Sequence, residues 1–255
     1  MNASTLLGTA RTEYHMQVSR WTLWAVPAAA EALLLATGSF AFQPGRDPAS
    51  VSKMIGDQAV SMNLIVLVIV GALLADRWVR DRHLGVEELL HSLPASAPTR
   101  LWGKYLGVAA ASATPLLVVW AVLTARVVIH FGSARAAATA AGAYLAIVLP
   151  GLAFVAAFSI VCPRVTGVRV YQVLFVGYWF WGNLVPQRTM PTLSGTWLTP
   201  IGKYANAGLF SHASHSLLLT GGGSPGTGYA SIALLACITI GLLAGASLHE
   251  YRRPR

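Results

Sequence analysis

Six long apolar stretches dominate this sequence of 255 residues. Each has roughly the 17–25 residues that an α-helix needs to cross a bilayer. A segment such as SMNLIVLVIVGALLA, residues 61–75, leaves no polar helix face for contact with water. The sequence therefore predicts an all-α integral membrane protein, a single domain over residues 1–255 with six transmembrane helices, at Trp21–Phe42, Ala59–Ala75, Leu106–Ile129, Ala136–Val161, Val170–Pro186 and Tyr229–Leu248.

The composition supports a membrane protein and argues against a nucleic-acid-binding one. Hydrophobic residues make up 55% of the chain and charged residues 11%, whereas a soluble domain carries about 25% charged residues. The net charge of +9 would by itself also fit a nucleic-acid partner. The basic residues gather between the apolar stretches on one side, however, which is the pattern of membrane topology.

The basic residues also predict the orientation. With six spans both termini lie on one side, and 12 of the 18 Lys and Arg residues fall on that side against 6 on the other. Positively charged loops stay in the cytoplasm, so both termini are expected there. The cytoplasmic set is Arg11, Arg20, Arg77, Arg80, Arg82, Arg100, Lys104, Arg164, Arg169, Arg252, Arg253 and Arg255; the outer set is Arg46, Lys53, Arg126, Arg135, Arg188 and Lys203.

Residues 1–20 are predicted to form an interfacial helix. One apolar stripe recurs at helical spacing, with polar and charged residues around the rest of the helix, which is typical of a helix lying in the bilayer interface. A flexible N-terminus is the alternative. The stripe comprises Leu7, Ala10, Tyr14, Val18 and Trp21.

The cytoplasmic loop over residues 81–104 is the most specific stretch of the chain. Its apolar residues predict a short amphipathic helix, with Glu87 and Glu88 in the first turn, where the helix dipole favours negative charge, and Pro94 at the end. A short exposed helix held between two membrane helices is suited to contact with a partner; a solvated connector is the alternative. The apolar residues are Val86, Leu89, Leu90 and Leu93.

This loop resembles the stretch between the second and third membrane helices of ABC type-2 transporter permeases. The matching residues are Arg82, Gly85, Glu88-Leu89-Leu90, Ser92-Leu93-Pro94 and Gly103-Lys104. The layout of an N-terminal elbow helix, six spans and cytoplasmic termini is similar too. The resemblance implies that Gly85 to Pro94 form a coupling helix that docks on an ATP-binding subunit.

The resemblance also implies the partners and the location. The chain lacks the G-x-x-x-x-G-K-[ST] phosphate loop, so we expect it to bind no cofactor, to catalyse no reaction, and to leave ATP and magnesium to a separate ATPase subunit. Two ATPase copies and a second permease, identical or homologous, are expected in a bacterial cytoplasmic membrane. An ion-coupled carrier, or another polytopic membrane protein without an ATPase, is the alternative.

The long outer connection, residues 187–228, is predicted to contain a short interfacial or re-entrant helix. The stretch Tyr204 to Leu219 is too apolar for an aqueous loop and too short to span a bilayer. His212 and His215 lie one helical turn apart, but with no third ligand nearby the sequence predicts no metal site.

Two features inside the spans are candidates for function. Glu31 lies about ten residues into the first span, where a carboxylate is costly and faces protein or water. It either hydrogen-bonds another helix or lines a transport path. Tyr178, Trp179 and Trp181 form either an interfacial aromatic belt or a surface for a substrate or a second subunit. We find no pairing of acids, Ser with His, or metal ligands that predicts a catalytic site.

Overall fold

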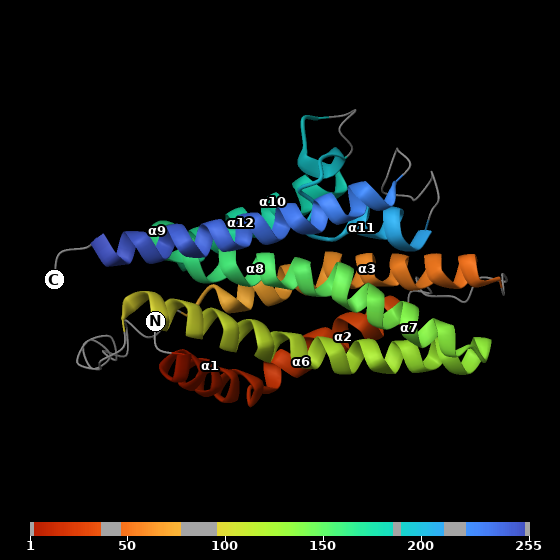
Figure 1. Cartoon of the computed structure of the whole chain (residues 1–255), viewed down its shortest axis with the longest axis horizontal. Helices are drawn as coiled ribbons and strands as arrows, with labels where there is room; N and C mark the ends of the chain where they lie inside the picture. The colour runs from red at the N-terminus through yellow and green to blue at the C-terminus, as the bar shows by residue number, and fades with distance from the viewer. Residues whose placement is uncertain (1–2, 37–46, 78–95, 186–189, 212–222, 253–255) are drawn as a thin grey trace.

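The structure is a computed structural model that describes residues 3–36, 47–77, 96–185, 190–211 and 223–252. Within these ranges every regular element is helical. The long helices run along the longest axis of the molecule, and both chain ends lie in the same half of it (Figure 1). The even number of spans predicted from the sequence requires this placement of the two termini.

Four helices of the described ranges are long and apolar enough to cross a membrane. They match the second, third, fourth and sixth predicted stretches. The first and fifth stretches contain α2, Trp21–Ala36, and α10, Val168–Leu184, with 16 and 17 described residues. The four candidate spans are Pro48–Leu74 (α3), Ala97–Phe131 (α6), Ala134–Thr166 (α7 to α9) and Pro225–Glu250 within α12, Pro225–Arg252.

Helix α3 starts eleven residues before the predicted span at Ala59. Its first turn is capped by Asp47, whose carboxylate accepts the backbone N–H of Ser50 at 3.0 Å, and Pro48 occupies the first helical position, where its missing N–H costs nothing. The hydrogen bonds from Ser50 hold the pKa of Asp47 below its ordinary value. Local capping thus extends the helix beyond its apolar part.

Helix α6 is longer than the bilayer requires. It begins after Ser96, whose hydroxyl caps the N–H of Thr99, and it ends at Gly132, which adopts a left-handed conformation with φ of 64°. Its 35 residues extend about 52 Å at 1.5 Å per residue, whereas the hydrocarbon core of a bilayer is about 30 Å thick. Helix α6 is therefore longer than a perpendicular crossing of the hydrocarbon core needs.

The third candidate span, Ala134–Thr166, contains a π-helical turn. Helix α7, Ala134–Ala143, continues through η1, Tyr144–Val148, into α8, Leu149–Val161, and α9, Pro163–Thr166. Pro150 follows the π turn and provides no N–H for the helical hydrogen-bond ladder, which is a common cause of such local distortion. The turn faces a segment from the outer connection, described below.

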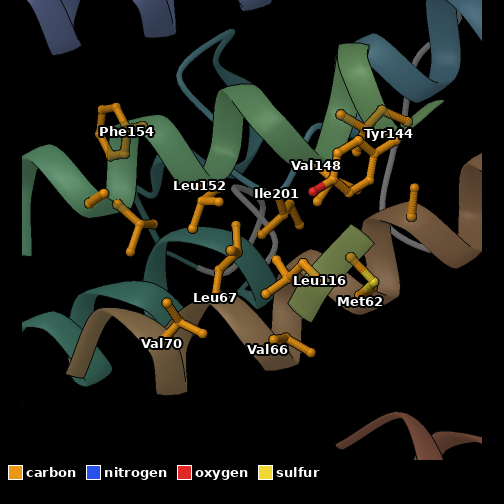
Figure 2. Close-up of a cluster of buried hydrophobic side chains, with 14 of the residues drawn as sticks. Met62, Val66, Leu67, Val70, Leu116, Tyr144, Val148, Leu152, Phe154 and Ile201 are labelled. Carbon is orange, nitrogen blue, oxygen red and sulfur yellow. The ribbon is translucent and has the colours of Figure 1, made fainter. Parts of the chain in front are cut away.

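The apolar core lies between α3, α6, α8 and α12, with α8 in contact with the other three. Figure 2 shows side chains of α3 and α8 pointing toward one another, among them Leu67 and Leu152. Ile201 enters the same space from the outer connection and is fully buried. The core is therefore closed in part by a segment that does not span the membrane.

The remaining elements are short or lie at the ends of the molecule. Helix α1, Ala3–Val18, confirms the helix predicted for the N-terminus. The outer connection holds a 3₁₀ turn, η2, Leu193–Gly195, then α11, Lys203–Asn206, and a second π turn, η3, Ala207–Ser211. His212 and His215 lie outside the described residues, and so does the C-terminal part of the helix predicted from Tyr204 to Leu219.

Candidate functional site

The predicted coupling segment, from Gly85 to Pro94, lies outside the described residues. This includes all of its named residues, Gly85, Val86, Glu87, Glu88, Leu89, Leu90, Leu93 and Pro94. The structure does describe the two helices that it joins, α3 and α6. Of the residues that carry the family resemblance, Gly103 and Lys104 are described, and both lie where α1 meets α6.

Gly103 and Gly107 bring α1 into close contact with α6. A Cβ atom on Gly103 would lie 2.8 Å from the Cβ of Thr9, and one on Gly107 would lie 2.4 Å from the carbonyl oxygen of Ala10. Real Cβ atoms do not approach other atoms so closely. The two glycines, one turn apart on α6, therefore form the surface on which α1 rests.

Polar contacts hold the same interface. The ammonium of Lys104 lies 3.5 Å from a carboxylate oxygen of Glu13, and both side chains are largely buried. Further along, the hydroxyls of Tyr14 and Thr114 are 3.1 Å apart. The contacts advance together along both helices, so α1 lies side by side with α6. Its predicted position in the plane of the lipid headgroups stays a prediction.

The exposed face of α1 differs in part from the predicted apolar stripe. Ala10, Tyr14 and Val18 are half-buried, but Leu7 and Trp21 are exposed. Because Gly103 and Gly107 of α6 have no side chain, the backbone of Leu6 and Ala10 lies close to that helix. The interface thus depends on close backbone approach more than on large apolar side chains.

Glu31 is buried within the described part of the chain, with 2% of its surface exposed. Neither of its carboxyl oxygens has a hydrogen-bond partner among the described residues. The hydrogen bond to another helix, one of the two alternatives drawn from the sequence, is therefore not seen there. A buried carboxyl group without a hydrogen-bond partner costs free energy. Such a group is expected where the carboxyl binds a proton, a cation or another ligand.

The three aromatic residues singled out on α10 do not form one surface. Trp179 is fully buried and donates its indole N–H to the carbonyl of Leu64 on α3 at 2.7 Å. Tyr178 is half-buried, and Trp181 is exposed. Trp179 anchors α10 to α3, because the helical repeat turns it inward with Tyr171 and Phe175. For Tyr178 and Trp181, the belt and the substrate or subunit surface stay predictions.

Residues 199–211 of the outer connection pack into the helical bundle, and we call them the re-entrant segment. Their position in a membrane stays a prediction. Asn63, fully buried on α3, donates from its amide to the carbonyl of Ile147 at 2.9 Å and to that of Ile201 at 3.5 Å. Asn63 lies near the middle of α3, so the segment reaches well into the bundle. A Cβ on Gly151 would lie 2.3 Å from the carbonyl oxygen of Pro200, which shows how closely the segment packs on α8.

Two further polar contacts hold the re-entrant segment. Asn206 donates to the carboxylate of Asp57 at 2.7 Å, beside Gly56, where a larger residue would displace it. Lys203 is buried and donates to the backbone carbonyl of Asn183 at the end of α10. The roles of these residues were not predicted from the sequence. Lys203 and Asn206, two polar residues that closely follow Gly202 in an otherwise apolar segment, are the signal that could have indicated them.

Four buried side-chain oxygens in the described part of this region lack a hydrogen-bond partner. The side-chain oxygens of Asn63, Asn183, Thr199 and Asn206 have no donor among the described residues. Buried polar groups that lack protein partners commonly bind ordered water. We find no group of three or more His, Cys, Asp or Glu residues that could hold a metal ion within the described ranges.

Comparisons with known proteins do not identify the chain. No protein-family model, no curated protein and no solved structure matches it. The protein is helical, and its described residues include four helices that are long and apolar enough to cross a membrane.

Proposed function

We propose that this chain is the membrane-spanning permease subunit of an ATP-binding cassette exporter, coupled to a separate ATPase subunit. The observation that carries the proposal is the loop over residues 81–104, with its Glu-Leu-Leu and Ser-x-Pro pattern and its Gly103-Lys104 pair. The structure adds that this pair seats α1 on α6 through Thr9 and Glu13. The end of the loop is thereby fixed to the N-terminal helix.

The proposal takes α2 and α10 as the two remaining spans. The 17 residues of α10 extend about 25 Å, close to the roughly 30 Å of the hydrocarbon core. Six spans place both termini on the side with more Lys and Arg, the cytoplasm of a bacterial cell. The chain then forms one half of a translocation path through the cytoplasmic membrane.

The length of α6 suits it to transmit force from an ATPase. Its apolar part begins near Leu106, so that residues 97–105, about 13 Å of helix, project on the cytoplasmic side. The predicted coupling segment ends at the start of this projection. A partner that pushes on the segment acts on a continuous helix that crosses the membrane and carries α1 with it.

The assembly we propose has two permease and two ATPase subunits. The ATPase subunits bind ATP and magnesium, since this chain has no phosphate loop of its own. Purification of the tagged chain from its native membrane should yield an ATPase of matching stoichiometry. A monomer that carries no ATP-binding partner would contradict the proposal.

The sharpest test is the double variant Leu89→Ala/Leu90→Ala. Buried anchors of an interface each contribute on the order of 2 kcal/mol or more when truncated, or about thirtyfold in affinity. We expect loss of ATPase co-purification and of substrate-stimulated hydrolysis, with an unchanged thermal unfolding profile. Val165→Ala is the matched control, because Val165 on α9 is 89% exposed on the same side of the membrane. ATPase binding equal to that of the control would refute the coupling role.

Glu31 supports a second candidate, an ion-coupled carrier. Carriers place ionisable groups inside the membrane, and Glu31 is buried without a hydrogen-bond partner among the described residues. Gradient-driven uptake into vesicles without any ATPase, abolished by Glu31→Gln, would favour the carrier. For the exporter, Glu31→Gln should leave the complex assembled, and a fall in ATP-driven transport would place Glu31 on the path. Unchanged transport would assign it a structural role.

A further inference from the structure

An open cavity of about 810 Å³ lies where α3 and α10 meet the break between α1 and α2. Its charged and polar lining consists of Arg20, Arg169, Asp76 and Gln172, and its apolar lining includes Leu73 and Val170. The described elements bring these residues together from three separate parts of the chain. Neither the transport proposal nor the family resemblance uses this cavity.

Local structure places the two arginines at the cavity. The helix breaks at Ser19 and Arg20, between α1 and α2, and this break sets Arg20 on the cavity wall. Gly167, with φ of 81°, makes the turn into α10 and precedes Arg169. Among the described residues, neither arginine forms an ion pair, so both guanidinium groups are available to a ligand.

The start of α10 adds to the positive potential. Val168, Arg169 and Val170 line the cavity and form the first turn of a 17-residue helix. The first-turn N–H groups of a helix have no acceptor within it, and they carry the positive end of the helix dipole. Gly167 offers no capping side chain, and the first turn contains no acidic residue. Among the described residues of the lining, Asp76 is the one carboxylate, and it opposes this potential in part.

The position of the cavity identifies the kind of anion. It lies at the end of α3, directly after the apolar part of the candidate span ends at Leu74, which is the depth of the lipid headgroups. Leu73 and Val170 are 42% and 54% exposed, so that the cavity opens onto an apolar outer face of the bundle. A ligand with a phosphate next to acyl chains matches both the basic cavity and the apolar face beside it. Basic pockets between membrane helices on the cytoplasmic side bind such headgroups.

We propose that this cavity binds the phosphate headgroup of an anionic phospholipid. Arg20 and Arg169 pair with the phosphate oxygens, the first turn of α10 donates to them, and the acyl chains leave past Leu73 and Val170. The bound lipid joins the α1–α2 break to α3 and α10. The site requires only that the chain lies in a membrane, and it is independent of an ATPase partner.

Native mass spectrometry of the purified full-length chain, titrated with phosphatidylglycerol or with phosphatidylcholine, tests the site. We expect a preference for phosphatidylglycerol, and at least a tenfold loss of its affinity in Arg20→Gln/Arg169→Gln. Arg11→Gln, which removes an exposed arginine on α1 outside the cavity, should bind as the wild type does. A double variant that binds like Arg11→Gln would overturn the proposal.

Asp76→Asn provides a test of opposite sign. Removal of this carboxylate should tighten phosphatidylglycerol binding, whereas loss of fold would weaken it. Unchanged or weaker binding by Asp76→Asn would therefore also count against the site. Glycerol phosphate in solution distinguishes the two sources of the phosphate group: if it binds as tightly as phosphatidylglycerol, the cavity takes a soluble phosphate and the lipid proposal fails.

Discussion

Replacement of Gly107 by alanine should detach α1 from α6. The added Cβ would lie 2.4 Å from the carbonyl oxygen of Ala10 and 2.7 Å from the Cβ of Glu13. The first of these is a backbone atom and cannot turn aside, so α1 must move by roughly 1 Å to restore an ordinary contact distance. Such a shift also affects the Glu13–Lys104 pair, now at 3.5 Å, and the Tyr14–Thr114 hydrogen bond, now at 3.1 Å.

The contributions to the free energy of this change can be summed as order-of-magnitude values. Overpacking costs about 1–3 kcal/mol, and the weakened hydrogen bond adds about 1 kcal/mol. Alanine in place of glycine favours the helix by about 1 kcal/mol. The net loss of about 2 kcal/mol corresponds to about a thirtyfold increase in the fraction of molecules with α1 detached.

Hydrogen exchange of the amides in residues 3–18 measures this fraction directly, because exchange through local opening reports its free energy. Gly8→Ala, which lies on α1 itself, is the control, since a Cβ at Gly8 meets no atom within 4 Å. That variant should slow the exchange of α1 by its helix propensity. If Gly107→Ala exchanges as slowly as the wild type, the two-glycine seat does not hold α1 and the argument is wrong.

Two further matched pairs test the interior. Trp179→Phe should lower stability by about 1 kcal/mol or more through loss of the hydrogen bond to α3. Trp181→Phe, at an exposed position, should change stability by less than about 0.5 kcal/mol. Equal effects of the two variants on thermal unfolding in detergent would contradict the burial of Trp179. Gly202→Ala should lower the stability of the protein more than Gly132→Ala does. Both glycines have positive φ, of 82° and 64°, but only at Gly202 would a Cβ meet a neighbour, Ile147 at 2.6 Å; unfolding curves that rank the two variants in the reverse order would refute the close packing.

Four of the six apolar stretches could be predicted as helices long enough to cross a membrane, because length and hydropathy alone decide such helices. Their ends could not. The predicted span begins at Ala59, after Lys53 and Asp57, yet the helix includes both. Asp47 caps the first turn of this extension, and Asn206 donates to the carboxylate of Asp57. A hydropathy window detects the apolar part of a helix but not the tertiary partner that extends it.

The candidate site was predicted only in part, for a similar reason. An apolar stretch too short to span a bilayer predicts an interfacial or re-entrant helix in the outer connection, and the described residues 199–211 pack against α3 and α8. The partners of these residues, such as Asn63, depend on which face of α3 turns inward, and a stretch that is apolar on all faces does not reveal this. Trp179 illustrates the same difficulty: Tyr171, Phe175 and Trp179 recur every four residues and share the inward face of α10, a repeat hidden by the neighbouring aromatic residues.

Helix α3 connects the re-entrant segment to the cavity. Asp57 in its N-terminal half and Asn63 near its middle hold the re-entrant segment, and Asp76, just after its C-terminal end, lines the cavity from which the chain continues toward the predicted coupling segment. Its 27 residues form a rod of about 40 Å. Asn206 packs against Gly56 without space for even a methyl group, and close-packed contacts transmit displacement instead of absorbing it. Under the proposed function, a push on the coupling segment therefore moves the re-entrant segment as well, which links ATP hydrolysis in the cytoplasm to the outer end of the path through one helix.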